Sequence, residues 1–227
     1  MSTSKGTDLL VLAAHAPELV GLRGTLGSSL AGVVRGLRVV CATVGVGMPV
    51  AGAGAMRQLR EVKPRAALLI GSCGVYPKQG EHAPLDLVVP DKIALIDPTV
   101  LGGKAAFPAP MQTLIEPDSE LCHGLATGEH DVHRGCVATT LSITIDDALA
   151  SRLGRKSGCQ TENLEAFSVA LACAAADVPF ATVLAVTNSV GSRGRQQWSK
   201  HQRKAAEGCG RLVLDWIHRG ARGLPAR

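Results

Sequence analysis

Leu37-Arg-Val-Val-Cys-Ala-Thr-Val44 and Arg65-Ala-Ala-Leu-Leu-Ile70 are two short apolar runs that flank residues 49–62. Runs of this length, bounded by polar or turn residues, are typical of strands that are buried on both faces. The intervening segment contains Ala51-Gly-Ala-Gly-Ala55, whose small side chains allow a helix to pack closely on a sheet. We therefore predict a βαβ unit with two parallel strands.

The rest of the chain repeats this alternation of apolar strands and helices. We expect further strands at 8–14, within 85–96 on both sides of Pro90-Asp91, at 135–145 and at 180–186, and helices at 146–154, 164–176 and 196–219. Alternating strands and helices favour a parallel sheet that is covered on both faces. The predicted fold class is α/β, with one domain over residues 1–227 and a central mixed, mainly parallel sheet flanked by helices in three layers.

Composition excludes several classes of protein. Hydrophobic residues make up 46% and charged residues 19% of the 227 residues, which is typical of a folded chain and not of a disordered one. The longest charge-free stretches contain Pro or Asn and are shorter than a membrane span, so we expect no membrane partner. The seven cysteines form no Cys-x-x-Cys pair, and the N-terminus lacks the apolar core of a secretory signal. Reduced thiols and a cytoplasmic location are therefore expected.

The net charge of +5 is concentrated near the C-terminus. Residues 193–227 contain nine Lys and Arg against Glu207 and Asp215. Nucleic-acid binding would favour basic residues interleaved with aromatic rings, and this segment contains only Trp198 and Trp216. We interpret the charge as a solvated helix face and expect no nucleic-acid partner.

Polar and glycine residues follow the predicted strands, at the end of a parallel sheet where ligands bind. Glu18 follows the first strand, Gly45-Val-Gly47 the second, Gly71-Ser-Cys-Gly74 the third and Thr187-Asn188 the last. Neither glycine motif has the full pattern of a dinucleotide site or of a phosphate loop, so no cofactor is expected. Each motif alone is equally compatible with an ordinary turn.

Taken together, these motifs resemble the nucleoside phosphorylase and nucleosidase superfamily over nearly the whole chain. Glu162-Asn-Leu-Glu165-Ala before an apolar helix belongs to the same pattern. Gly74-Val-Tyr-Pro77 and the segment Asn188–Trp198 look most like futalosine hydrolases, which cleave futalosine to hypoxanthine and dehypoxanthine futalosine in menaquinone biosynthesis. The resemblance implies an N-ribosyl hydrolase that acts on a small purine nucleoside and forms a homodimer or larger homo-oligomer.

The resemblance also implies roles for particular residues. Glu18 would be the general base that activates water, and Glu165 would bind the ribose hydroxyls, with Leu164 where Met is usual. Asn188 would act on the leaving base, and its amide suits a 6-oxopurine better than the usual Asp, which suits adenine. The remaining substrate-binding positions implied are Gly47, Ser72, Cys73, Gly74, Phe107, Ile143, Thr144 and Asn163.

Two further departures from the family pattern are present in the sequence. Gly194 stands where the resemblance leads us to expect Asp, and Ser72-Cys73 replaces a small apolar pair.

The chain has only six Phe, Tyr and Trp residues. We expect three of them, Tyr76, Phe167 and Trp198, near the pocket, Phe107 in a loop able to cover it, and Phe180 and Trp216 in the core.

Three alternatives remain open from the sequence. The same fold could use phosphate as the nucleophile, as a purine nucleoside phosphorylase does, although no Arg precedes Arg193 in the strand-end motifs. The chain could bind nucleosides or nucleic acid without catalysis. A zinc site could be built from His130-x-x-His133-x-x-Cys136 with Cys122-His123, but the spacing is not a standard ligand pattern, so no metal is expected.

Overall fold

The strands of the protein share one mixed sheet built around a long central strand. The computed structural model describes residues 6–226; residues 1–5, on which part of the expectation about a secretory signal falls, lie outside this range. Within it, the sheet has 11 strands. Its main path runs β2 (Ala31–Val34), β3 (Leu37–Thr43), β1 (Leu9–Ala13), β4 (Ala66–Val75), β10 (Thr161–Asn163), β9 (Cys136–Thr139), β6 (Lys92–Leu95) and β7 (Leu114–Ile115).

A second branch leaves β4 on its other edge. There β4 pairs in parallel with β11 (Phe180–Ser189), which pairs with β5 (Leu87–Val88), and β5 pairs with β8 (Val132–His133). The strands β3, β1, β4 and β11 are all parallel, which confirms a mixed, mainly parallel sheet. The predicted βαβ unit is also confirmed: helix α2 (Met48–Val62) connects β3 to β4, and β1 lies between the two strands.

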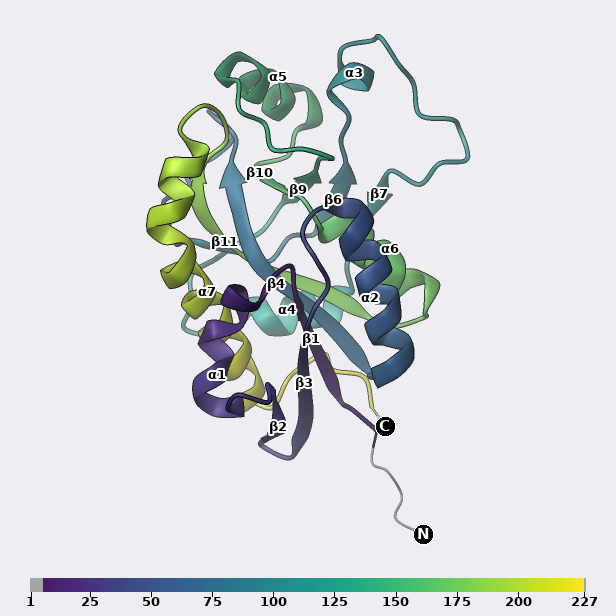
Figure 1. Cartoon of the computed structure of the whole chain (residues 1–227), viewed down its shortest axis with the longest axis vertical. Helices are drawn as coiled ribbons and strands as arrows, with labels where there is room; N and C mark the ends of the chain where they lie inside the picture. The colour runs from purple at the N-terminus through teal and green to yellow at the C-terminus, as the bar shows by residue number, and fades with distance from the viewer. Residues whose placement is uncertain (1–5, 227) are drawn as a thin grey trace.

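Helices cover both faces of the sheet (Figure 1). On one face, α1 (Val20–Leu26), α4 (Ser119–Ala126) and α7 (Gly194–His218) share an apolar cluster with alternate residues of β1, among them Leu9 and Val11. On the other face, α2 and α6 (Ala166–Ala175) pack on the intervening residues, including Leu10. Burial on both faces explains why the strands are continuous apolar runs. The shorter helices are η1 (Ala16–Leu19), α3 (Pro98–Leu101) and α5 (Asp147–Ser157).

The bounds of several predicted elements differ in the structure, and for two of them the local cause is clear. The strand expected at 135–145 ends at Thr139, because the backbone N–H of Thr144 is turned to the Glu162 carboxylate, 3.2 Å away, instead of to a neighbouring strand. The helix expected from Leu164 begins at Ala166, because the side chain of Asn163 accepts the backbone N–H groups that open the helix.

The prediction that all cysteines are reduced is wrong for one pair. Cys136 and Cys159 form a disulfide, with Cα atoms 4.5 Å apart. Cys136 opens β9 and Cys159 precedes β10, and these parallel strands lie side by side. A separation of 23 residues hides this proximity in the sequence. The other five cysteines are free and buried.

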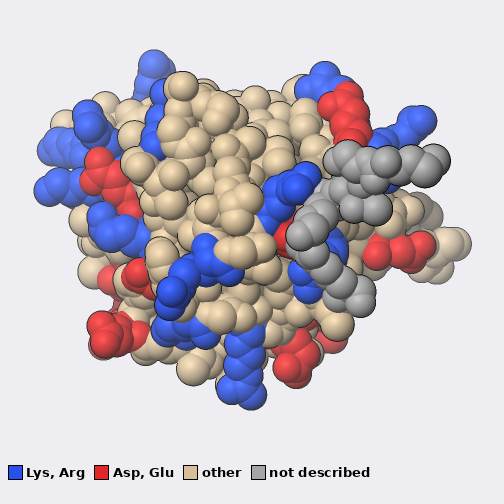
Figure 2. Space-filling model, turned by 90° about the horizontal axis from the view of Figure 1, so that it is seen from below, with Lys and Arg blue, Asp and Glu red and all other residues tan. Residues whose placement is uncertain are grey.

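The charged surface gives no continuous basic face in the view of Figure 2. Lys and Arg side chains stand there in separate groups, with acidic and uncharged residues between them. Three arginines have acidic partners: Arg65 pairs with buried Asp8 at 2.6 Å, Arg203 with Glu207 at 3.2 Å, and Arg134 with Asp91. No helix within residues 6–226 combines the length and the apolar character that a membrane span requires.

Helix α7 is held against α1 by a close approach of two glycines. A Cβ added to Gly210 would lie 2.6 Å from the carbonyl carbon of Gly21, and one added to Gly21 would lie 2.8 Å from the carbonyl oxygen of Ala206. Since both obstacles are backbone atoms, neither helix can yield without a shift of the whole element. This contact sets the position of the side chains that α7 presents to the sheet.

Gly210→Ala is therefore expected to destabilise the protein by about 1–3 kcal/mol, the usual cost of forcing extra volume into a packed interior. Chemical denaturation followed by circular dichroism measures the change. Gly208→Ala, on the same helix, is the matched control, because its Cβ would lie 3.6 Å from the nearest atom, in ordinary contact. That variant is expected to keep or slightly raise stability, since Ala favours helix over Gly. Equal effects of the two substitutions would contradict the proposed close packing.

Candidate active site

The ends of four parallel strands bring the predicted site motifs to one edge of the sheet. Glu18 lies in η1 after β1, Gly47 precedes α2 after β3, and Asn188 lies at the end of β11. The motif Gly71–Gly74 is not the turn expected from its glycines. It continues β4, at the point where the antiparallel partner β10 begins to pair with that strand.

Glu18 is held by the turn that follows β1. The carboxylate oxygen Oε2 accepts the backbone N–H groups of Ala14 at 3.0 Å and His15 at 3.4 Å. The other oxygen, Oε1, lies beside Gly71, where an added Cβ would be only 3.2 Å away. The residue is 9% exposed. The absence of a side chain at Gly71 leaves one face of this fixed carboxylate accessible from β4.

His15 is the ion-pair partner of Glu18 when its imidazole is protonated. Its Nδ1 lies 3.2 Å from Oε2 of Glu18. The hydrogen bond to Glu18 raises the pKa of His15, burial opposes this effect, and the negative charges of Glu18 and Glu165 add to it. Because the folded-state pKa is raised, the interaction stabilises the fold fully below the ordinary histidine pKa of about 6.5. That contribution is lost as the pH rises through the raised value.

Glu165 is a second buried carboxylate, at the N-terminal end of α6. Its Oε1 accepts the backbone N–H of Gly47 at 2.8 Å, and its Oε2 accepts the side-chain amide of Asn163 at 3.1 Å. Burial raises the pKa of Glu165, these two hydrogen bonds lower it, and the charge of Glu18 raises it further. The two carboxylates therefore act on each other electrostatically, as groups that share one site do.

Asn163 links Glu165 to the central strand. Its Nδ2 also donates to the backbone carbonyl of Ser72 at 3.0 Å. Its Oδ1 accepts the backbone N–H groups of Glu165 at 2.8 Å and Ala166 at 2.7 Å. The side chain is 7% exposed and all its hydrogen-bonding groups have partners, so it fixes the position of Glu165 rigidly.

Asn188 lies at a bulge near the end of β11. Its Oδ1 accepts the hydroxyl of Thr187 at 2.7 Å, and one N–H of its Nδ2 donates to the carbonyl of Ser189 at 2.9 Å. Two glycines make room for the amide: an added Cβ would approach Nδ2 to 2.8 Å at Gly74 and 3.2 Å at Gly194. Asp in place of Gly194 would crowd this amide, which gives the departure from the family pattern a physical reason.

A cavity of about 360 Å³ opens beside Glu18. Trp198 of α7 forms part of its wall, where the indole Nε1 donates to Oγ of Ser72 at 3.3 Å and the ring stacks on His15 with centroids 6.4 Å apart. The wall is mixed in chemistry, with apolar, aromatic, anionic and cationic groups. The residues that line it are His15, Pro17, Glu18, Val20, Gly71, Ser72, Trp198, Ser199, Gln202, Arg203 and Ala206.

Of the predicted site residues, Glu18 and Ser72 line this cavity, whereas Glu165, Asn163 and Asn188 are not among its lining residues. Ile143 and Thr144 line a second cavity, of about 140 Å³, whose wall shares no residue with the first. The thiol of Cys73 is buried in the apolar cluster beneath α2 and α6, and only its backbone carbonyl, bonded to Thr187, faces the strand end. Phe107 is half-buried in the loop between α3 and β7, and Leu164 is half-buried directly before Glu165.

Of the three aromatic residues expected near the pocket, Tyr76, Phe167 and Trp198, one lines the cavity and two are buried away from it. Trp198 lines the cavity as predicted. Tyr76 is 1% exposed, and its hydroxyl donates to Glu162 at 2.7 Å, so its role is to hold that carboxylate. Phe167 is buried in the cluster beneath α2 and α6, as is Phe180, and Trp216 is buried in the cluster on the other face.

Three residues of this region were missed by sequence reasoning. His15 directly follows the first predicted strand and lies three residues before Glu18, which was an available signal. Glu162 accepts hydrogen bonds from Tyr76 and from the Thr144 hydroxyl, both at 2.7 Å, and stabilises the loop that follows β9. Arg203 lines the cavity from α7, but a charged residue on an amphipathic helix carries no such signal.

The zinc site considered from the sequence is not assembled. Cys136 is in the disulfide, and His130 pairs with Asp215. The thiol of Cys122 is buried, which raises its pKa to about 11, and it contacts the carbonyl of Pro90. His133 instead lies beside Asp86 at 3.0 Å.

The fold and the strand-end site define the class of protein. The sequence model described as the phosphorylase superfamily matches residues 15–218. Since this match spans most of the chain, the protein belongs to the phosphorylase superfamily. No curated protein sequence matches the chain significantly.

Solved structures of the same fold are similar over nearly their full length. A 5′-methylthioadenosine/S-adenosylhomocysteine nucleosidase from Helicobacter pylori has a TM-score of 0.84 at 14% identity, over 95% of this chain and 100% of that one. A futalosine hydrolase mutant from H. pylori has a TM-score of 0.84 at 15% identity, over 94% and 99%. The corresponding methylthioadenosine nucleosidase from Neisseria meningitidis has a TM-score of 0.81 at 18% identity, over 94% and 99%.

Replacing Glu18 with Gln is expected to lower the pKa of His15, because the neutral amide removes the main cause of its upward shift. The titration of the imidazole protons of His15 by NMR measures this change. Glu116→Gln, the same substitution at an exposed position, is expected to leave the titration as it is in the wild type. A His15 titration unaffected by Glu18→Gln would contradict the assigned ion pair.

Proposed function

We propose that the protein is an N-ribosyl hydrolase that cleaves the glycosidic bond of a 6-oxopurine nucleoside, with futalosine as the substrate and hypoxanthine and dehypoxanthine futalosine as products. The observation that carries this proposal is the pair of buried, hydrogen-bonded carboxylates, Glu18 and Glu165, which follow or face the ends of the parallel strands. Membership of the phosphorylase superfamily and the likeness to structures named as nucleosidases and as a futalosine hydrolase support it. A place in menaquinone biosynthesis in the cytoplasm follows from the same assignment.

Glu18 is the group best placed to activate water. Backbone N–H groups hold its Oε2, Oε1 lies against Gly71, and the residue is part of the cavity wall. A carboxylate in this position can take a proton from a water molecule as that water attacks the anomeric carbon.

Glu165 suits the ribose. An ionised carboxylate has about four acceptor positions, of which Gly47 and Asn163 occupy one each. The remaining positions can accept the 2′- and 3′-hydroxyl groups. Its negative charge also favours the positive charge that develops on the sugar as the bond breaks.

Asn188 suits a 6-oxopurine. The Thr187 hydroxyl on Oδ1 orients the amide so that one N–H of Nδ2 remains free of the bond to Ser189. That N–H can donate to O6 or N7 of the base, which stabilises the departing hypoxanthine. An amide has no proton to give to an adenine.

Phosphorolysis is the second candidate, because Arg203 and His15 both line the cavity and could meet a phosphate. Arg203 is already paired with Glu207, however, and phosphate beside Glu18 would place a dianion next to a carboxylate. These charges favour water. Nucleoside binding without catalysis would leave the fixed geometry of Glu18 unexplained.

We also propose that the chain forms a homodimer or larger homo-oligomer. Helix α6, the surface expected from the sequence, is largely buried within the subunit, with Leu171 42% exposed. More apolar surface lies on the loop after β9, where Leu141, Ile143 and Ile145 are 65–73% exposed. The molar mass from light scattering tests this assembly.

Glu18→Gln is expected to lower the rate of hypoxanthine release from futalosine by about 10²–10⁴-fold, the usual contribution of a general base. Product analysis by chromatography, with and without phosphate, measures the rate and identifies the sugar product. Glu116→Gln is the control with unchanged turnover. A free sugar product in both conditions supports hydrolysis. A sugar 1-phosphate formed only with phosphate would establish phosphorolysis instead, and unchanged turnover in Glu18→Gln would remove Glu18 from the mechanism.

Asn188→Asp is expected to shift the ratio of kcat/KM for inosine or futalosine over methylthioadenosine by about 10–100-fold toward the 6-aminopurine, the worth of one charge-assisted hydrogen bond. Steady-state kinetics on the three nucleosides measure the ratio. Gln112→Glu makes the same change from amide to acid at an exposed position and should leave it unchanged. An unaltered ratio in Asn188→Asp would refute the role of this amide in base recognition.

A further inference from the structure

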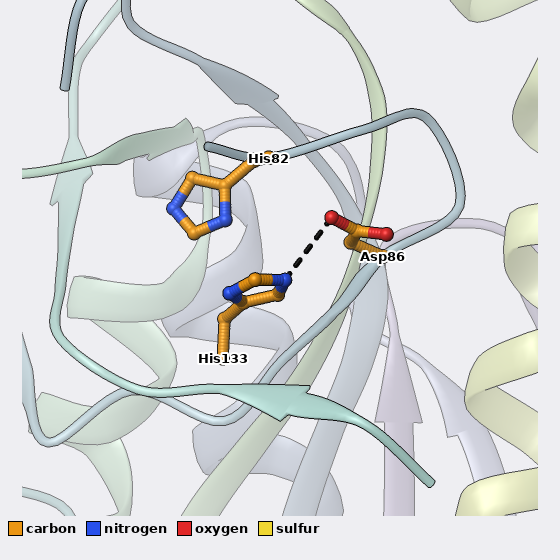
Figure 3. Close-up of side chains that lie close together, drawn as sticks. All are labelled: His82, Asp86 and His133. Carbon is orange, nitrogen blue, oxygen red and sulfur yellow. Dashed lines mark hydrogen bonds and ion pairs between the residues drawn. The ribbon is translucent and has the colours of Figure 1, made fainter. Parts of the chain in front are cut away.

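Two histidines and one aspartate converge on the β5–β8 edge of the sheet. Figure 3 shows a ring nitrogen of His82, a carboxylate oxygen of Asp86 and a ring nitrogen of His133 facing a common space. One ligand atom from each residue lies within 4.8 Å of the other two. His133 Nε2 is 3.0 Å from Asp86 Oδ2, and the rings of His82 and His133 meet edge to face with centroids 4.4 Å apart.

The fold positions these three side chains through backbone bonds. Strand β8 pairs in parallel with β5, with His133 opposite Val88, and the carbonyl of His133 accepts the N–H of Val89 at 3.0 Å. Asp86 directly precedes β5, and its carboxylate accepts the N–H of Ala83 at 2.7 Å, which folds the loop back toward His82. The cluster is therefore a product of two elements far apart in the sequence.

One ring nitrogen of His82 is available as a metal ligand. Its Nδ1 is buried from water, yet it has no hydrogen-bond partner among the described residues. A buried polar atom without a partner costs free energy, which a bound cation would recover. The other two side chains are about 30% exposed, so an ion can enter from solvent.

We propose that His82, Asp86 and His133 bind one divalent late transition-metal ion, with Zn²⁺ as the representative. Two imidazoles and one carboxylate are ligands that Zn²⁺, Co²⁺ and Ni²⁺ prefer, whereas Mg²⁺ and Ca²⁺ prefer oxygen alone. Water would fill the remaining position of a tetrahedron. The site lies outside the residues assigned to nucleoside cleavage, and it does not depend on that function.

The distances fit an ion after a small closure. Ligand atoms of a tetrahedral zinc site lie about 3.3 Å apart, given metal–ligand lengths of about 2.0–2.1 Å. Asp86 and His133 already meet this separation at 3.0 Å. The ligand atom of His82 lies within 4.8 Å of these two atoms, and His82 belongs to the segment 80–86, which is mostly exposed.

A bound ion would clamp this loop onto the strand that carries Asn188. The backbone of Val186 forms hydrogen bonds with the last two residues of the loop. Its carbonyl accepts the N–H of Leu85 at 2.7 Å, and its N–H donates to the carbonyl of Asp86 at 2.9 Å. Val186 lies at the bulge next to Asn188. The proposed role of the metal is therefore structural: it would connect β8 and the segment 80–86 to β11.

Titration of the chelator-treated full chain with ZnCl₂ by calorimetry, and with CoCl₂ by visible absorption, tests the site. We expect one ion per chain and the intense d–d absorption of four-coordinate Co²⁺. His82→Ala and His133→Ala are each expected to weaken metal binding by at least about 100-fold. This loss exceeds the loss that follows when a residue hydrogen-bonded to a metal ligand is replaced. The ion is also expected to raise the Tm of the wild type and not of these variants.

His130→Ala is the matched control, because His130 also belongs to a His–Asp pair, with Asp215, but is not part of the three-ligand cluster. It should bind the metal as the wild type does. Circular dichroism of each variant checks that the fold is retained. The absence of binding to the wild type, or an affinity that His82→Ala leaves unchanged, or one that His130→Ala lowers equally, would each overturn the proposal.

Discussion

The candidate site depends on the hydrogen bonds of the Asn163 side chain. One amide connects the backbone of the central strand at Ser72, the carboxylate of Glu165 and the first N–H groups of α6. Strand β10 ends at Asn163, and helix α6 begins three residues later, at Ala166. Asn163 therefore sets both the start of the helix and the position of the Glu165 carboxylate. Its burial makes each of these bonds costly to lose, because no water can replace the missing partner. A small change at this position would therefore disturb the sheet, the helix and the site together.

The sequence was most informative where one physical pattern repeats. The apolar runs of β1, β3 and β4 are buried on both faces, so their parallel arrangement could be predicted from residues 8–70 alone. The positions of Glu18, Gly47 and Asn188 followed from the rule that parallel strands end at one edge. Local pattern was insufficient for Gly71–Gly74, whose glycines resemble a turn but lie within β4. There the close approach of Glu18 and Asn188 requires glycine, and this requirement involves residues distant in sequence.

Contacts between remote segments were the part that the sequence could not specify. The disulfide between Cys136 and Cys159 depends on the register of β9 and β10, and that register is set by partners elsewhere in the sheet. The spatial neighbours of His133 could not be predicted for the same reason: its near neighbours in sequence are His130 and Cys136, but the parallel pairing of β8 with β5 brings it to Asp86. Spacing predicts a ligand set only when all ligands lie on one local element.

The two carboxylates of the site explain how the arrangement can favour a reaction instead of only a bound state. Glu18 and Glu165 repel each other, and burial adds to the cost of their charges, as the raised pKa of Glu165 reflects. Backbone N–H groups of Ala14 and Gly47 offset part of this cost, and His15 adds to this offset when its imidazole is protonated. In the proposed reaction the ribose becomes positively charged between these groups. The repulsion is then relieved most in the transition state, so electrostatic strain that the fold maintains in the free protein is converted into a lower barrier to bond cleavage.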